Sequence, residues 1–145
     1  MVVTTKASGP VVGLEEYLAK QQPEDRAIME ALTVLIRCGL KDSVLRIWHR
    51  HPVWFLNGNP IVGFSREKRG TRLMFWSGAD FDESKLNVRG GKFKDASIFY
   101  TAPEEIDAAA LLQWLEKSRH IQWDYQNIVK RKGVLVRIDT NPSNE

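Results

Sequence analysis

The sequence contains one cysteine, Cys38, among its 145 residues. A single thiol cannot close an internal disulfide, which excludes a small disulfide-stapled scaffold and favours a reducing compartment. No apolar run approaches the roughly 20 residues of a membrane-spanning helix, and the opening residues lack the apolar core of a signal peptide. We therefore expect a cytoplasmic protein without a membrane partner.

A strong charge of one sign is also lacking. The formal net charge is +3, from 21 lysines and arginines against 18 acidic residues. Basic residues gather in three short segments, "REKRGTR" (66–72), "RGGKFK" (89–94) and "KRKGVLVR" (130–137). None is as long as a nucleic-acid-binding arm, so we favour solvated turns and do not expect a nucleic acid partner. A basic surface that meets phosphates or acidic partners is the alternative.

Recognised catalytic and nucleotide-binding motifs are missing as well. Ser65 follows Gly63 without the second glycine of a hydrolase nucleophile elbow. Cys38 falls on the apolar side of a predicted helix, where a thiol is typically inert. The acidic loop 78–84 lacks the glycine and the final acid of a calcium-binding loop, and 89–94 lacks the serine or threonine of a phosphate-binding loop. We therefore expect that the protein is not an enzyme.

The length of the chain corresponds to one domain. A domain of this size buries about 68–70% of its unfolded surface, so it needs neither disulfides nor a structural metal to fold. We expect a flexible N-terminus over residues 1–12, one α+β domain over 13–133 and a C-terminal tail over 134–145. Apolar residues alternate from Val134 to Ile138, which is compatible with a short strand in that tail.

The N-terminal quarter is predicted to be helical. The helical pattern begins at Leu14, and Pro23 is suited to the first turn of a second segment that ends near Gly39. Apolar residues in this second segment recur at three- and four-residue spacing, which predicts one buried face. They are Ile28, Ala31, Leu32, Leu35 and Ile36.

Five segments in the middle of the chain have the character of strands. They are 44–49, 53–56, 61–65, 71–76 and 96–100. Asn57-Gly58 between the second and third is a strong hairpin signal. The first four segments are joined by short turns, which makes them largely antiparallel, because a parallel crossover needs about a dozen residues.

A long C-terminal helix is predicted to follow the strands. Thr101 and Glu104 have the spacing of a capping box, and Gly133 is suited to end the helix. Between them, residues of one face recur at three- and four-residue steps. They are Leu111, Trp114, Ser118, Ile121, Tyr125 and Ile128. The expected fold class is therefore α+β, with an antiparallel sheet of four to five strands packed by an N-terminal helical region and a long C-terminal helix.

Four stretches, in this order, resemble the YdhG-like family of domains of unknown function. They are "LEEYLAKQQPEDRAIMEALTVLI", "VLRIWHRHPVWFLNGNPIVGF", "RLMFWSGADF" and "GGKFKDASIFYTAPEEIDAAALLQWL". The resemblance runs from about Gly13 to Gly133, and its most specific part is the aromatic-x-x-x-Pro element from Trp48 to Pro52. Family members often carry glycine two residues before this proline, whereas this chain carries Arg50. The resemblance implies an α+β fold, and one branch of the family is described as a frataxin-like iron chaperone.

The segment "IWHRHPVWF" (47–55) raises the question of a ligand site. His49 and His51 are two residues apart, so on one extended strand both imidazoles would point to the same face and could reach one ion. Two nitrogens do not complete a metal site, and a partly exposed strand end is the alternative. Tryptophans on a sheet either line a ligand pocket or form the core between sheet and helices. The candidate ligand-binding residues are Trp48, His49, His51, Trp54 and Trp76.

The resemblance to the iron chaperone branch implies surface carboxylates as iron ligands, since iron accepts oxygen donors. Acidic residues are frequent in the first helical region. The candidates are Glu15, Glu16, Glu24, Asp25 and Glu30. Neighbouring residues on a helix diverge by about 100°, so these acids do not all share one face. A solvated helix surface with favourable charges at helix N-termini is the alternative interpretation.

Two kinds of function stay open. The first is non-enzymatic binding of a metal, with iron suggested by the family resemblance, or of a small ligand in a cavity between the open sheet face and the 77–94 loop. The second is an interaction module that presents its basic turns and exposed aromatics to a protein or nucleic acid. We favour the first and place an unrecognised enzyme last. A homo-oligomer is compatible with the sequence.

Overall fold

The computed structural model describes residues 9–138, and for residues 9–12 it describes the backbone. The expected flexible N-terminus therefore lies mostly outside the described residues. The part that is described is helical, because helix α1 begins at Gly9. Residues 139–145 of the expected tail also lie outside the described residues.

Two helices form the N-terminal quarter, as the sequence predicts. They are α1 (Gly9–Ala19) and α2 (Pro23–Gly39). Pro23 occupies the first turn of α2, where its missing N–H costs nothing, and Glu24 and Asp25 lie near the positive end of the helix dipole. The buried residues of α2 are Ile28, Met29, Leu32, Thr33 and Ile36.

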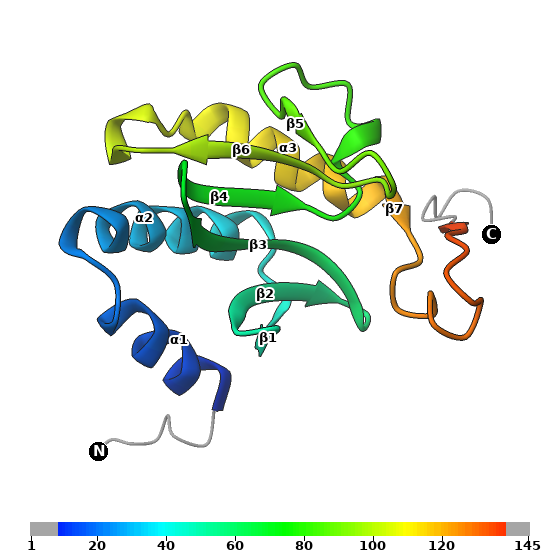
Figure 1. The fold of residues 1–145 in the computed structure, drawn as a ribbon, viewed down its shortest axis with the longest axis horizontal. Helices are drawn as coiled ribbons and strands as arrows, with labels where there is room; N and C mark the ends of the chain where they lie inside the picture. Colours follow the sequence, from blue (N-terminus) through cyan, green and yellow to red (C-terminus); the bar gives the residue numbers. More distant parts are fainter. Residues whose placement is uncertain (1–8, 139–145) are drawn as a thin grey trace.

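The centre of the molecule is a six-stranded antiparallel sheet (Figure 1). The strands are β1 (Val44–Trp48), β2 (His51–Leu56), β3 (Asn59–Glu67), β4 (Gly70–Phe75), β5 (Val88–Arg89) and β6 (Ala96–Tyr100). Their spatial order is β1-β2-β3-β4-β6-β5. The five predicted strands are all present, and β5 is a sixth strand that the sequence pattern does not predict.

Two short connections in the sheet follow the predicted turn chemistry. Asn57 and Gly58 join β2 to β3 with φ values of 51° and 82°. A tight two-residue hairpin requires positive φ at both positions, which Asn and Gly adopt at low cost. At the other end of β3, Glu67 pairs with Gly70 and closes the next hairpin.

The hydrophobic core lies on one face of the sheet. Helices α2 and α3 (Ala108–His120) lie behind the strands in Figure 1. Leu73 and Phe75 alternate toward them, and the Phe75 ring contacts the ring of Trp114 on α3 with centroids 6.3 Å apart. The intervening Arg72 and Met74 are partly exposed on the opposite face. One face is therefore packed by helices and the other is open, as expected for a half-buried antiparallel sheet.

The prediction of one long C-terminal helix is partly wrong. Asp107 caps helix α3 by accepting a hydrogen bond from the Ala110 backbone N–H (3.1 Å), so the predicted Thr101–Glu104 capping box is not formed. A short 3-10 helix, Pro103–Glu105, occupies that place. Helix α3 ends at His120 rather than near Gly133.

After α3 the chain forms a second, smaller sheet. Strand β7 (Gln122–Trp123) pairs with β8 (Arg137–Ile138), so a short strand lies in the C-terminal tail. Turns occupy the residues between them. Another 3-10 helix, Gly78–Asp80, follows β4. Within residues 9–138, none of the helices has the length and apolarity required to cross a membrane.

Candidate functional site

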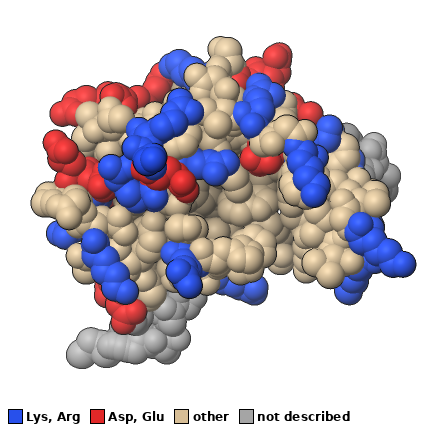
Figure 2. All heavy atoms as spheres, viewed as in Figure 1, with Lys and Arg blue, Asp and Glu red and all other residues tan. Residues whose placement is uncertain are grey.

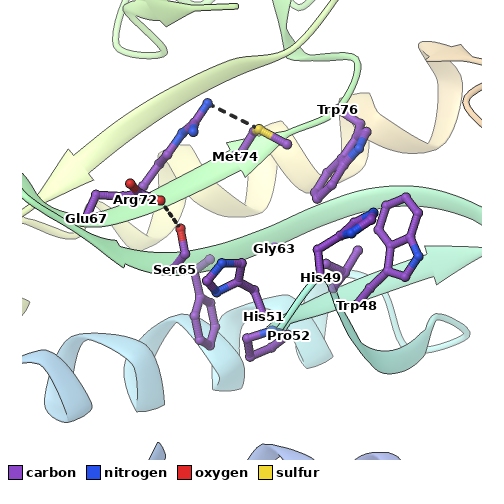
Figure 3. Close-up of a pocket in the computed structure, with 12 residues that line it drawn as sticks. Trp48, His49, His51, Pro52, Gly63, Ser65, Glu67, Arg72, Met74 and Trp76 are labelled. Atoms are coloured by element: carbon purple, nitrogen blue, oxygen red, sulfur yellow. Dashed lines mark hydrogen bonds between the residues drawn. The ribbon is translucent and has the colours of Figure 1, made fainter. Parts of the chain in front are cut away.

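A cavity of about 250 Å³ opens on the face of the sheet that the helices leave uncovered. It is built from strands β2, β3 and β4 and from the turn between β1 and β2 (Figure 3). The residues that line it are Trp48, His49, His51, Pro52, Val53, Gly63, Phe64, Ser65, Glu67, Arg72, Met74 and Trp76. Figure 2 shows this side of the molecule, with uncharged surface at its centre and separate groups of Lys and Arg around it.

The turn that borders the cavity has an unusual backbone. Trp48 pairs with His51, and the two residues between them have positive φ, 52° for His49 and 73° for Arg50. The left-handed region costs a non-glycine residue roughly 1–2 kcal/mol. The two histidines therefore do not share one strand face, and the prediction of a His-x-His pair on an extended strand is wrong. His49 belongs to the turn, and His51 begins β2.

Aromatic rings form one end of the cavity. The His49 ring lies against Trp48 with centroids 4.4 Å apart, and Trp48 faces Trp76 at 6.0 Å with an interplanar angle of 38°. Phe55 supports Trp48 from the side at 5.4 Å. Trp48 remains 36% exposed, so its ring is accessible to a ligand.

Polar side chains form the other end. The Ser65 hydroxyl donates a hydrogen bond to Glu67 Oε2 (2.7 Å). Opposite Ser65 on β4, Arg72 donates from Nε to the hydroxyl of Ser97 (2.8 Å) and lies 3.6 Å from the carboxylate of Asp95. The cavity therefore combines an apolar aromatic end with a few convergent polar groups, which is typical of small-molecule sites.

Gly63 keeps the floor of the cavity flat. A Cβ atom at this position would lie 2.6 Å from the carbonyl oxygen of Pro52 on the neighbouring strand. Backbone atoms cannot move aside as the end of a flexible side chain can. The close approach of β2 and β3 here therefore requires glycine.

His51 lies below the rim and is held neutral. Burial lowers the pKa of its imidazole below the ordinary value of 6.5, and the nearby Glu67 carboxylate opposes this shift. The Nδ1 atom of His51 is buried, and nothing in the described part of the chain forms a hydrogen bond with it. An unpaired buried nitrogen costs free energy unless a ligand or water satisfies it.

Four of the five candidate ligand-binding residues line this cavity. They are Trp48, His49, His51 and Trp76. The fifth, Trp54, belongs to the core, because it is 2% exposed and packs against Phe64 at 5.6 Å. The cavity lies on the open sheet face as expected, but its lining residues include none from the 77–94 loop.

Sequence reasoning missed the polar end of the cavity. Glu67 and Ser65 alternate with Gly63 on β3, and Arg72 and Met74 alternate with Trp76 at the end of β4. The period of two was visible in both segments. The pairing of Ser65 with Arg72, which places these residues side by side, was not visible in either one alone.

The candidate iron ligands are placed on two helices. Glu15 and Glu16 belong to α1, whereas Glu24, Asp25 and Glu30 belong to α2. Asp25 accepts a hydrogen bond from Arg66 Nε at 2.9 Å and is thus committed to an ion pair. Among residues that the structure describes, no group of three or more His, Cys, Asp or Glu side chains is arranged to hold a metal ion. Cys38, predicted on the apolar side of its helix, is exposed.

A second and larger cavity of about 530 Å³ lies between the β2–β3 turn and the C-terminal segment. Its lining is mostly polar, but the charged groups are already partnered. Arg119 pairs with Asp42 at 2.8 Å, and Asp124 pairs with Arg131 at 2.6 Å. The cavity on the open sheet face is therefore the stronger candidate.

Comparisons with known proteins bear on the fold. No family model matches the sequence, and no curated protein matches it. A solved structure does: the crystal structure of a protein of the DUF1801 family, YdhG, from Bacillus subtilis. It superposes with a TM-score of 0.56 at 20% identity, over 84% of this chain and 93% of that one.

The chain has a YdhG-like fold. The resemblance seen in the sequence is thereby confirmed at the level of the fold. At 20% identity the likeness of the YdhG-like folds carries no information about shared site residues, so the function of this cavity has to be argued from its own side chains.

Proposed function

We propose that this YdhG-like chain is a non-enzymatic binding protein that takes a small ligand into the cavity on the open face of its sheet. The observation that carries the proposal is the combination of aromatic walls at one end of the cavity with the polar side chains of Ser65, Glu67 and Arg72 at the other. A ligand that enters the cavity gains apolar contact with Trp48 and Trp76 and meets the polar side chains at the other end.

The hydrogen bonds in the cavity support binding rather than catalysis. A serine nucleophile is activated by a histidine base in hydrogen-bond contact with its hydroxyl. Here the Ser65 hydroxyl donates to Glu67, and the guanidinium of Arg72 is occupied by Ser97 and Asp95. These contacts hold the side chains in place around a ligand.

A small organic ligand is better supported than iron. The cavity contains two indoles, an imidazole against one of them and the thioether of Met74, and hard metal ions prefer oxygen ligands. The acidic residues considered for iron lie on helices α1 and α2, away from this lining. A cytoplasmic location is part of the proposal, because Cys38 is a lone and exposed thiol.

A fragment screen by nuclear magnetic resonance tests the proposal. We expect small aromatic fragments to shift the indole N–H signals of Trp48 and Trp76 and to leave those of Trp54 and Trp114 in place, because the latter two are buried in the core. Replacement of Trp76 by Ala should abolish these shifts. Phe99→Ala is the matched control, since Phe99 pairs with Arg72 on the same face but does not line the cavity. The proposal is wrong if millimolar fragments leave both rim tryptophans unshifted.

An interaction module is the second candidate, and edge strand β1 favours it. Val44 is 51% exposed, Ile47 is 40% exposed and Trp48 is 36% exposed on this strand. Edge strands with exposed apolar residues pair with other chains, including second copies of the same chain. Sedimentation analysis across a dilution series, with Ile47→Lys as the disrupting variant, tests this. A mass that stays monomeric in both proteins would count against the homo-oligomer.

A further inference from the structure

The two ionised groups at the polar end of the cavity differ in how well they are neutralised. The guanidinium of Arg72 lies 3.6 Å from the Asp95 carboxylate, and its Nε donates to Ser97. Glu67 accepts a hydrogen bond from the Ser65 hydroxyl, which carries no charge. Among the ion pairs formed within residues 9–138, none includes Glu67.

No positively charged histidine lies beside Glu67 to neutralise its carboxylate. The Glu67 carboxylate acts to raise the pKa of the His51 imidazole, but burial of the ring has the larger effect and lowers that pKa below 6.5, so the ring is mostly uncharged at neutral pH. Arg66, the preceding residue, directs its Nε to Asp25 and its Nη1 to the backbone carbonyl of Glu67, and it forms no ion pair with the Glu67 carboxylate. Glu67 is therefore the carboxylate of the cavity lining, and within residues 9–138 it forms no ion pair with a basic side chain.

The opposite end of the cavity is suited to an apolar group. An indole ring buries a large apolar surface and packs against other aromatic rings with centroids about 4.5–7 Å apart. Trp48 and Trp76 present two such rings, with the thioether of Met74 beside them (Figure 3). A thioether is polarisable and contacts apolar groups of varied shape.

The distance between the two ends sets the shape of the ligand. The Trp76 backbone N–H donates to the Ile61 carbonyl (3.0 Å), which places Trp76 opposite Ile61 on β3. The Glu67 carboxylate lies over Ser65, four residues further along that strand. Four residues of strand span about 13 Å, so the cavity favours an elongated molecule.

We propose that the cavity binds an elongated organic amine whose protonated end meets Glu67 and whose apolar end lies between Trp48 and Trp76. This inference rests on the proposed function, since it names the ligand class of the same cavity. It adds a charge preference that the binding proposal does not require.

Three probes of one shape and different charge test the preference. They are phenylbutylamine, phenylbutanol and phenylbutanoate, titrated into the full-length protein and followed by the indole N–H signals of Trp48 and Trp76. We expect the amine to bind about tenfold more tightly than the alcohol, the order expected for one charge-assisted hydrogen bond. The carboxylate should bind most weakly, because Glu67 repels it.

The variant Glu67→Gln isolates the charge. Glutamine still accepts the Ser65 hydroxyl hydrogen bond, so the fold should be preserved, and an unchanged midpoint of thermal unfolding checks this. We expect the affinity for the amine to fall about tenfold and the affinity for the alcohol to stay the same. Glu104→Gln is the matched control, because Glu104 is an exposed glutamate that does not line the cavity.

The outcomes separate the charge preference from the proposed function. Equal binding of all three probes at the tryptophans, or a Glu67→Gln variant that keeps the preference for the amine, overturns the amine inference and leaves ligand binding by the cavity intact. Binding of none of the probes also overturns the amine inference. In that case the fragment screen decides separately whether the cavity binds small molecules.

Discussion

The side chain of Asn59 joins the β2–β3 hairpin to a segment more than sixty residues away in the sequence. Its Nδ2 donates to Gln122 Oε1 at 3.2 Å and to the Trp123 carbonyl at 3.0 Å. Its Oδ1 accepts from the backbone N–H groups of Tyr125 and Gln126, both at 3.0 Å. Asn59 is 2% exposed, so this one amide satisfies four polar groups of the C-terminal segment in a buried environment.

Replacement of Asn59 by Ala should therefore loosen the C-terminal segment. A buried donor or acceptor left without its partner costs about 1–3 kcal/mol, and several are lost here, so we expect the free energy of unfolding to fall by about 2–3 kcal/mol. Urea unfolding measures this loss. Hydrogen exchange at the amides of Tyr125 and Gln126 should accelerate in the same variant.

Asn87→Ala provides the control for this change. Asn87 is exposed, and exposed substitutions usually alter stability by no more than about 0.5 kcal/mol. Equal stability of the Asn59→Ala and Asn87→Ala proteins would show that the buried amide does not hold the segment.

The β1–β2 turn gives a second prediction, in the stabilising direction. Arg50 has φ 73°, a conformation that glycine adopts without steric cost. Arg50→Gly should raise the free energy of unfolding by about 0.5–1 kcal/mol, since the relief of strain exceeds the added entropy of the unfolded chain. Arg50→Ala removes the same side chain but keeps the strained backbone, so it should give no gain. A gain of equal size from both variants would locate the effect in the arginine side chain instead.

Exposure of Cys38 gives a third prediction. The sequence places this residue on the apolar side of a helix, whereas the structure places it at the surface of α2. We expect a thiol reagent to label one cysteine per folded chain without denaturant, at a rate close to that of the urea-unfolded chain. Labelling that requires unfolding would show that the thiol is covered.

The strands could be predicted because their signals are local. Asn57-Gly58 fixes one hairpin through its own backbone preferences, and alternating apolar residues mark the segments on each side. Strand β5 has only the two residues Val88 and Arg89, which is too short for any alternation to be seen. Its existence depends on pairing with β6.

The end of the last helix could not be predicted in the same way. Leu111, Trp114 and Ser118 are buried on one face of α3 as their spacing predicts. Tyr125 continues that spacing, yet its backbone N–H bonds to the side chain of Asn59 rather than to a helical carbonyl. The Asn59 side chain on β3 replaces the helical hydrogen-bond acceptor, and the sequence of the C-terminal segment alone cannot predict this contact.

About half of the candidate site could be predicted from the sequence. The aromatic end includes Trp48 and Pro52, which the sequence pattern already marks as a candidate ligand site, so this end could be predicted. Glu67 and Arg72 were not found, because each resembles an ordinary basic-turn residue until the register of β3 and β4 is known. Only the structure shows that a carboxylate lines the cavity.

The partly buried imidazole of His51 links stability to pH. Burial lowers its pKa in the folded protein below 6.5, the value expected in the unfolded chain. As the pH falls through this range, the unfolded chain takes up a proton that the folded chain does not. Stability therefore decreases as the solution becomes more acidic, and the contribution is fully present only at pH values above the unfolded pKa.

We expect the free energy of unfolding, measured with urea, to fall between about pH 7.5 and about pH 5.5, the range in which histidine titrates. His51→Asn should flatten this part of the profile, because asparagine takes up no proton. Below about pH 5 both proteins should lose stability together, since hydrogen bonds from Asn127 and Arg131 lower the pKa of Asp124 and this carboxylate must be protonated on unfolding. An unchanged slope near neutral pH in His51→Asn would show that this imidazole is not the titrating group.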